Sequence, residues 1–219
     1  MSTLSGTIED LRVLRCHRPV NHPAIIEFAP VARDVAIFLT PREAGGDEKP
    51  SRALLGHALR IRYGSAAEAS LAISGHGQPL IERGDMPCTF SSAAVGDQLV
   101  VAITGCGRIG IDMETVDRVA LNATPADRWL ADGERVVVNS LGGDGLVTEL
   151  ACCWVLKEAY GKARGVGLNY ALAEVAFRER DGRVRAIASH SPEAERVEAF
   201  DFALFRYGSL LFGLAQTHL

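Results

Sequence analysis

An alternating acidic pair lies near the middle of the chain, in the segment Gly110-Ile111-Asp112-Met113-Glu114. On a β-strand, successive side chains point to opposite faces, so Asp112 and Glu114 share one face, roughly 6.6 Å apart along the strand. Two carboxylates on one face repel each other unless water or a cation lies between them. An exposed acidic strand edge would explain the same pattern, so the pair alone does not establish a metal site.

A second polar segment, about forty residues later, has helical spacing. Trp154, Glu158 and Lys162 are four residues apart and therefore line one face of a helix. A surface Glu–Lys pair at this spacing is common and contributes only ~0.2–0.5 kcal/mol. Trp154 places a large apolar ring on the same face, which indicates that Glu158 lies near a partly buried boundary.

The two segments together could support phosphoryl-type group transfer. Asp112, Glu114 and Glu158 offer hard oxygen ligands of the kind that Mg²⁺ prefers, with water and substrate phosphate completing its shell. A lysine one helical turn from the third carboxylate would meet the charge that develops on a phosphate leaving group. We therefore expect a strand and a distant helix to bring these side chains together.

The elements that must position them are predicted from hydrophobic spacing. Helical periodicity predicts helices over 51–63 and 148–164 and a short one over 66–73, and the second long helix should end at Gly165 and Gly167. Short apolar runs between turn residues predict strands over 24–28, 35–39, 99–104, 109–113, 174–178, 197–206 and 209–216. Helices and strands mix in both halves without strict βαβ alternation, which is typical of an α+β fold.

Composition excludes several classes of protein. Of 219 residues, 47% are hydrophobic and 23% charged, and the net charge of -4 argues against a nucleic-acid partner, which needs a clustered basic excess. No apolar run approaches the ~18 residues of a membrane span. The five cysteines include no C-x-x-C pair, which favours reduced thiols in a cytosolic protein. The first residues lack a signal-peptide pattern, so we expect an unprocessed cytoplasmic chain.

The paired motifs resemble those of the surfactin-type 4′-phosphopantetheinyl transferases. These are Gly-Ile-Asp-x-Glu over 110–114 and Trp-x-x-Lys-Glu-Ala-x-x-Lys over 154–162. Weaker similarities lie at 51–56, at Gly77-Gln78-Pro79 where Gly-Lys-Pro is usual, and at 129–134, so the resemblance covers roughly residues 50–170. It implies two similar α/β subdomains with pseudo-twofold symmetry, over 1–105 and 106–219, with coenzyme A in the cleft between them.

The resemblance implies an enzyme that transfers 4′-phosphopantetheine from coenzyme A to a serine of an acyl- or peptidyl-carrier protein. It implies a magnesium-dependent monomer that serves fatty acid or secondary metabolite biosynthesis, with the carrier docking near 129–138. The site residues it implies are Asp112, Glu114 and Glu158 for Mg²⁺, Glu158 also as the base for the serine, Lys162 for departure of 3′,5′-ADP, and Lys157, Arg52 and the position of Gln78 for coenzyme A.

Two departures from the family pattern concern the 3′-phosphate of coenzyme A. The usual lysine is Gln78, and the usual histidine of Ser-His-Ser is Ala94. Losing two hydrogen bonds to a charged group could weaken binding by roughly two to four orders of magnitude. Other basic residues could compensate (His76, Arg60 and Arg83). The alternatives are a transferase with altered donor recognition, such as use of dephospho-coenzyme A, or a non-catalytic relative that binds a carrier protein or nucleotide.

Other motifs have simpler explanations. Residues 105–110 match G-x-G-x-x-G, but a dinucleotide site needs a helix immediately afterwards, whereas a strand-like acidic segment follows. We therefore expect these glycines to form a tight turn between strands. Cys152 and Cys153 are predicted to pack inside the helix, and His57 to lie at the edge of the core.

Overall fold

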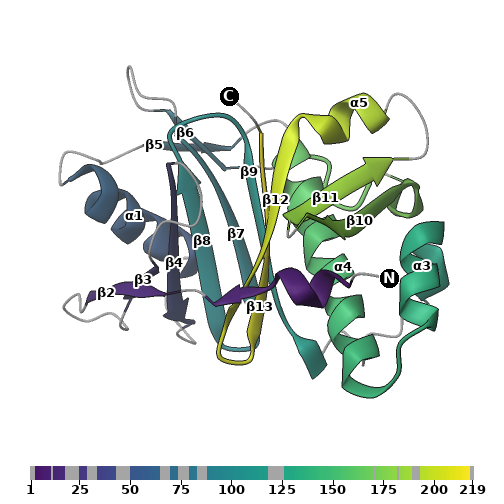
Figure 1. Cartoon of the computed structure of the whole chain (residues 1–219). Helices are drawn as coiled ribbons and strands as arrows, with labels where there is room; N and C mark the ends of the chain where they lie inside the picture. The colour runs from purple at the N-terminus through teal and green to yellow at the C-terminus, as the bar shows by residue number, and fades with distance from the viewer. Residues whose placement is uncertain are drawn as a thin grey trace.

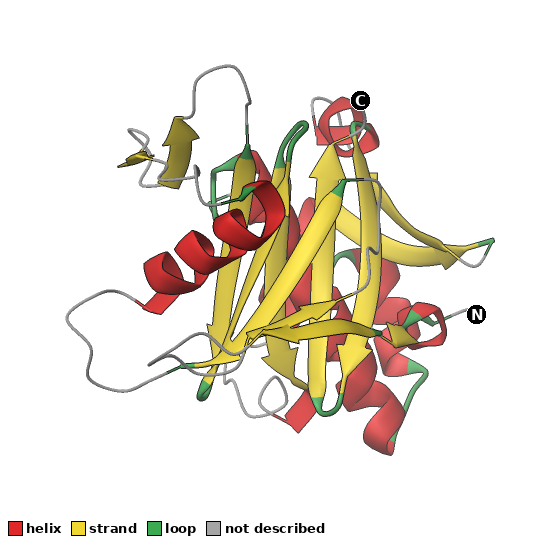
Figure 2. Ribbon diagram, turned by 90° about the vertical axis from the view of Figure 1, so that its left-hand side faces the viewer, coloured by secondary structure: helices red, strands yellow, loops and turns green. Residues whose placement is uncertain are grey.

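Two β-sheets that share an apolar core form the centre of the computed structural model (Figure 1). The structure describes residues 3–10, 12–17, 25–28, 34–42, 50–64, 70–73, 79–82, 88–117, 126–169, 171–181, 183–188 and 193–217. The shared core joins inward-facing residues of both sheets, such as Val100 and Ala102 of the first and Ile111 and Phe212 of the second. Each sheet carries a long helix on its other face (Figure 2).

The first sheet is antiparallel and has the order β2-β3-β4-β8-β7. Its strands are β2 (Val13–His17), β3 (Ile25–Phe28), β4 (Val35–Pro41), β7 (Thr89–Val95) and β8 (Gln98–Thr104). Helix α1 (Pro50–Tyr63) covers its outer face, where Leu54, Leu55 and Ala58 pack against Phe38 and Val101. This helix, β4 and β8 confirm the elements predicted from the apolar spacing.

A separate two-stranded sheet corrects one prediction in the N-terminal half. The short helix expected over 66–73 is wrong at its C-terminal end, because Ser70–Ile73 form strand β5 and pair with β6 (Pro79–Glu82). Four mostly apolar residues fit one helical turn or one short strand equally well. Pairing with β6, six or more residues later in the chain, determined that this segment forms a strand. Residues 65–69 lie outside the described part of the chain.

The second sheet has the order β10-β11-β12-β13-β9, and β1 (Glu9–Asp10) pairs in parallel with β12. Its other strands are β9 (Ile109–Thr115), β10 (Val175–Arg180), β11 (Arg183–Ala188), β12 (Phe200–Tyr207) and β13 (Leu210–Thr217). The strand predicted over 197–206 starts late, because Glu193–Glu198 form helix α5. The remaining short elements are α3 (Asp132–Asn139), η1 (Leu4–Thr7), η2 (Ala126–Arg128) and η3 (Leu172–Glu174).

Helix α4 (Gly143–Arg164) covers the outer face of the second sheet and contains the predicted 148–164 helix. It ends as predicted at Gly165, whose φ of 76° is a left-handed C-cap. The mixture of two main sheets and several helices confirms the α+β prediction, whereas the division at residue 105 stays a prediction. None of the helices in the described segments is long and apolar enough to cross a membrane.

Close contact between α4 and β9 depends on a missing side chain at Gly110. A Cβ atom placed there would lie 1.9 Å from the carbonyl oxygen of Ala159 and 2.6 Å from the amide nitrogen of Ala163. Both are backbone atoms of α4, so no flexible side chain can move aside. The glycine of Gly-Ile-Asp-x-Glu therefore sets the distance between the strand and the helix that carry the predicted site.

We expect Gly110→Ala to lower the free energy of unfolding by about 1–3 kcal/mol, the usual effect of overpacking. Gly56→Ala in α1 is the matched control, because no atom lies within 4 Å of its added Cβ. That control should gain roughly 0.5–1 kcal/mol from the better helix propensity of alanine. Urea unfolding of both variants measures the difference; equal effects would contradict the close approach of α4 to β9.

Candidate active site

Strand β9 presents its acidic residues to α4 and its apolar residues to the shared core. Ile109, Ile111 and Met113 are buried between the two sheets, as the alternating pattern predicts. Gly110, on the opposite face, lies against α4, so Asp112 projects on the helix side. Asp112 is buried there, opposite Gly213 of β13, another glycine against which α4 packs.

Lys162 of α4 reaches the place where the two sheets meet. Its Nζ atom donates to Oδ1 of Asp112 at 2.7 Å and to the carbonyl oxygen of Ile111 at 3.2 Å, both on β9. It also lies 3.4 Å from the carbonyl oxygen of Ser92 on β7, an edge strand of the first sheet. Its side chain as a whole remains 27% exposed.

Glu158 is crowded by other carboxylates. Burial, the repulsion of the Asp112 carboxylate and, to a smaller extent, that of Glu114 raise the pKa of Glu158 to about 7, although the Lys162 ammonium opposes the shift. Burial likewise raises the pKa of Asp112, again against the effect of Lys162. Strand β9 and helix α4 thus bring Asp112, Glu114, Glu158 and Lys162 close enough for their charges to interact.

The three carboxylates do not form an assembled ligand set. Within the described segments, no three Asp, Glu, His or Cys side chains are gathered closely enough to hold one metal ion. The donor chemistry nevertheless suits Mg²⁺, since all three groups are hard oxygen donors that repel one another. Atom Oε2 of Glu114 is buried and accepts no hydrogen bond from a described residue, although Glu114 makes another interaction. Side-chain movements would be needed for them to share a cation.

Lys157 has a structural position that corrects its predicted role. Its side chain is fully buried, and Nζ pairs with Glu134 of α3 at 3.0 Å and donates to the carbonyl oxygens of Leu172, at 2.7 Å, and Val175. Glu134 also accepts the amide hydrogen of Phe177 at 2.9 Å. The prediction that Lys157 contacts a coenzyme A phosphate is therefore wrong. One residue along a helix is a turn of about 100°, so Lys157 points away from the face of Glu158.

The remaining predicted residues are only partly placed. Gln78, like His76 and Arg83, lies outside the described residues. Arg52 is exposed on α1, and Ala94 is exposed on β7, two residues beyond Ser92. Of the predicted carrier-docking segment 129–138, Trp129 is buried with its ring 5.3 Å from that of Trp154. That tryptophan pair is part of the core rather than an exposed docking surface.

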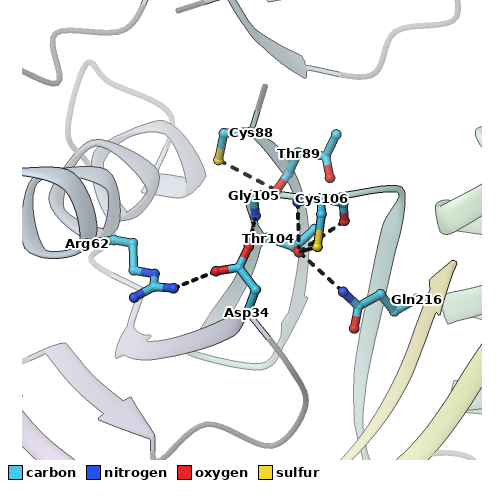
Figure 3. Close-up of polar contacts among 8 residues, drawn as sticks. All are labelled: Asp34, Arg62, Cys88, Thr89, Thr104, Gly105, Cys106 and Gln216. Atoms are coloured by element: carbon cyan, nitrogen blue, oxygen red, sulfur yellow. Dashed lines mark hydrogen bonds and ion pairs between the residues drawn. The ribbon is translucent and has the colours of Figure 1, made fainter. Parts of the chain in front are cut away.

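The glycine-rich segment after β8 forms the predicted turn, and polar contacts fix it (Figure 3). Asp34, itself at a left-handed φ of 61°, pairs with Arg62 of α1 at 2.7 Å and accepts the amide hydrogen of Gly105 at 2.7 Å. The Thr104 hydroxyl accepts from Gln216 of β13 at 3.2 Å. These contacts hold the turn beside α1 and link the end of β8 in the first sheet to β13 in the second. No sequence spacing indicated Asp34, because its partners are 28 and 71 residues away.

The raised pKa of Glu158 predicts how stability depends on pH in protein freed of metal ions. The folded state keeps a proton on Glu158 between pH 4.5 and about 7, where the unfolded chain has lost it, so this group destabilises the fold increasingly as pH rises through that range. We expect Glu158→Gln to gain stability relative to wild type across this window and to hold a constant lead above it. Urea unfolding from pH 4.5 to 8 tests this; a difference independent of pH would contradict the crowding.

Comparison with known proteins shows that part of this chain is similar to a known superfamily. Residues 108–205 match the sequence model of ACPS, the 4′-phosphopantetheinyl transferase superfamily. The match covers a little under half of the chain and includes Asp112, Glu114, Glu158 and Lys162. This part of the chain therefore carries the sequence signature of that superfamily, without singling out the surfactin-type subgroup. A comparison with curated proteins finds no match.

Solved structures show distant similarity. The holo-[acyl-carrier-protein] synthase of Thermotoga maritima is 22% identical with a TM-score of 0.41, covering 51% of this chain and 62% of its own, so the chain spans about three fifths of that protein. The holo-[acyl-carrier-protein] synthase of Neisseria meningitidis is 17% identical with a TM-score of 0.44, covering 51% and 98%.

Proposed function

We propose that the protein is a surfactin-type transferase that moves 4′-phosphopantetheine from coenzyme A to a serine of an acyl- or peptidyl-carrier protein. The observation that carries this proposal is the contact of Lys162 with Asp112 beside Glu158, inside the segment that matches the superfamily. It unites a base, a cation and an acidic pair at the junction of the two sheets. The reaction needs these groups.

Glu158 is the proposed base. Its pKa of about 7 in the metal-free protein suits a group that accepts the proton of the carrier serine near neutral pH. The serine oxygen then forms a bond to the phosphorus that bears pantetheine, and the bond from that phosphorus to the bridging oxygen breaks. The leaving 3′,5′-ADP carries away the electron pair, and the ammonium of Lys162 stabilises the negative charge that results.

Asp112, Glu114 and Glu158 are the residues that would hold Mg²⁺. A bound Mg²⁺ would neutralise charge on the pyrophosphate of the donor. Their oxygen donors and mutual repulsion favour a shared cation, which would draw the three carboxylates together. We further propose a monomeric cytoplasmic enzyme of fatty acid or secondary metabolite biosynthesis, a setting that suits five free thiols.

The test is the intact mass of apo-carrier proteins after incubation with the protein, Mg²⁺ and either coenzyme A or dephospho-coenzyme A. A gain of one phosphopantetheine with coenzyme A supports the proposal. An equal or higher kcat/KM with dephospho-coenzyme A would show that recognition of the 3′-phosphate has been lost, as Gln78 and Ala94 suggest. No gain with either donor, at saturating concentrations of both substrates, would overturn the proposal.

Ala94, exposed on β7 where the family has a histidine, favours one second candidate. This is a relative that binds a carrier protein or a nucleotide without transfer. Calorimetry separates it from an enzyme: carrier binding that Glu158→Gln leaves unchanged, without detectable binding of coenzyme A, would support the non-catalytic candidate.

A further inference from the structure

The outer face of the β10–β11 hairpin carries a cluster of arginines outside the site described above. The two strands pair Arg178 with Arg185 and Arg180 with Arg183. Directly opposite residues of an antiparallel pair point to the same side, so all four side chains lie on one face. The other face carries Val175, Phe177 and Val184, which are buried in the core under α4. Figure 1 shows the hairpin beside α3.

This arrangement leaves positive charge without close compensation. Like charges directly opposite each other on paired strands are destabilising. Arg180 lies 3.8 Å from Asp181, but both side chains are at least 80% exposed, and such pairs contribute little. Arg178, Arg183 and Arg185 form no ion pair with any residue in the described part of the chain.

Two further acidic residues lie at the edge of this face that borders β12. Glu9 and Asp201 line a small hollow between β11 and β12 together with Arg183 and Arg185. Their negative charges lower the positive electrostatic potential at that edge, but neither residue forms an ion pair with Arg183 or Arg185. The protein as a whole has a net charge of -4, so four arginines on two short strands are a local exception to its acidic character.

Apolar side chains accompany the arginines. Ile187 belongs to the same face of β11 and is 52% exposed. On the other side, Nη2 of Arg178 occupies the space over Gly133 of α3, 1.9 Å from where a Cβ would lie. One turn further along α3, Val136 is 51% exposed. Arginine beside exposed apolar side chains is typical of protein interfaces.

We propose that this face, formed by Arg178, Arg180, Arg183, Arg185 and Ile187, docks an acidic surface of a partner protein. Guanidinium groups form bidentate hydrogen bonds with carboxylates. Contact with carboxylates of a partner protein therefore relieves the repulsion between the paired arginines. The identity of that partner as the carrier protein rests on the proposed function. The face itself does not depend on it.

Arg185→Glu tests this docking, with Arg42→Glu as the matched control. Arg42 is exposed, and the bond it makes, from its backbone amide to Asp97, does not involve its side chain. With an acidic apo-carrier, Arg185→Glu should raise the KM for the carrier roughly tenfold or more. The kcat and the KM for coenzyme A should stay as in wild type. The thermal midpoint should equal or exceed that of wild type, because a like-charge pair is removed.

An unchanged carrier KM in Arg185→Glu, or an equal rise in Arg42→Glu, would overturn the proposal. Calorimetric binding of the same carrier at low and high salt provides a readout that needs no transfer. If wild type transfers nothing yet binds the carrier, and Arg185→Glu does not, the docking face stands while the proposed function fails. If inorganic polyphosphate binds this face and no acidic carrier does, the docking proposal fails.

Discussion

Replacing Lys157 by methionine is expected to lower the free energy of unfolding by about 3–5 kcal/mol at pH 8, the usual effect of breaking a buried ion pair. The substitution keeps the length of the side chain but removes the ammonium that Glu134 and the carbonyl oxygens of Leu172 and Val175 share. Glu134 is then a buried carboxylate without its counter-ion. Burial already raises its pKa, so it can become protonated at lower pH, and the loss should shrink as pH falls.

Urea unfolding at pH 5 and pH 8 measures this effect. Arg206→Met is the control, because Arg206 and Asp10 form an exposed pair at 3.0 Å whose loss should change stability by less than about 1 kcal/mol. The double variant Glu134→Gln with Lys157→Met should recover part of the loss, since no charge remains buried. Similar losses for Arg206→Met and Lys157→Met would contradict the structural role of the buried pair.

Glu158→Gln is expected to reduce kcat for phosphopantetheine transfer by about 10²–10⁴-fold, the range for removal of a general base. The amide has nearly the same shape but cannot accept the serine proton. Stability above pH 7 should not fall, because the substitution removes a carboxylate that Asp112 and Glu114 repel. Rates from the mass of the carrier, together with urea unfolding, separate a catalytic defect from an unfolded protein.

Glu174→Gln is the control for this experiment, since Glu174 lies exposed in η3. It should transfer at the wild-type rate. Lys162→Met should also lose transfer, because it removes the ammonium that contacts Asp112 and is proposed to stabilise the charge of the leaving 3′,5′-ADP. A Glu158→Gln variant that retains the wild-type kcat would exclude Glu158 as the base. It would not bear on the proposed role of Lys162.

The parts of the site that depend on local periodicity were predictable from the sequence. Alternation placed Asp112 on the opposite face of β9 from Ile111, because a strand with one face in the core must alternate. Spacing of four placed Glu158 and Lys162 on one face of α4, and Gly165 marked where that helix ends. These features follow from the chain within one element, so no knowledge of distant neighbours was needed.

Parts that depend on distant partners were not predictable in the same way. Lys157 follows the family motif, yet its ammonium pairs with Glu134, which belongs to another helix and has no sequence signal linking it to Lys157. The paired motifs predicted that Lys162 lies near Asp112, fifty residues upstream, but not that the two side chains form a direct ion pair. Segment 70–73 became a strand because β6 was available to pair with it. In each case tertiary contact outweighed local preference.

The central claim is that Asp112, Glu114, Glu158 and Lys162 act as one site, and titration of metal-free protein with Mn²⁺ by calorimetry tests it most directly. Wild type should bind one Mn²⁺ per chain, and Glu158→Gln and Glu114→Gln should each weaken binding by about ten- to a hundredfold, with Glu174→Gln unchanged. No saturable binding by wild type, or equal affinity in all four proteins, would contradict a shared site.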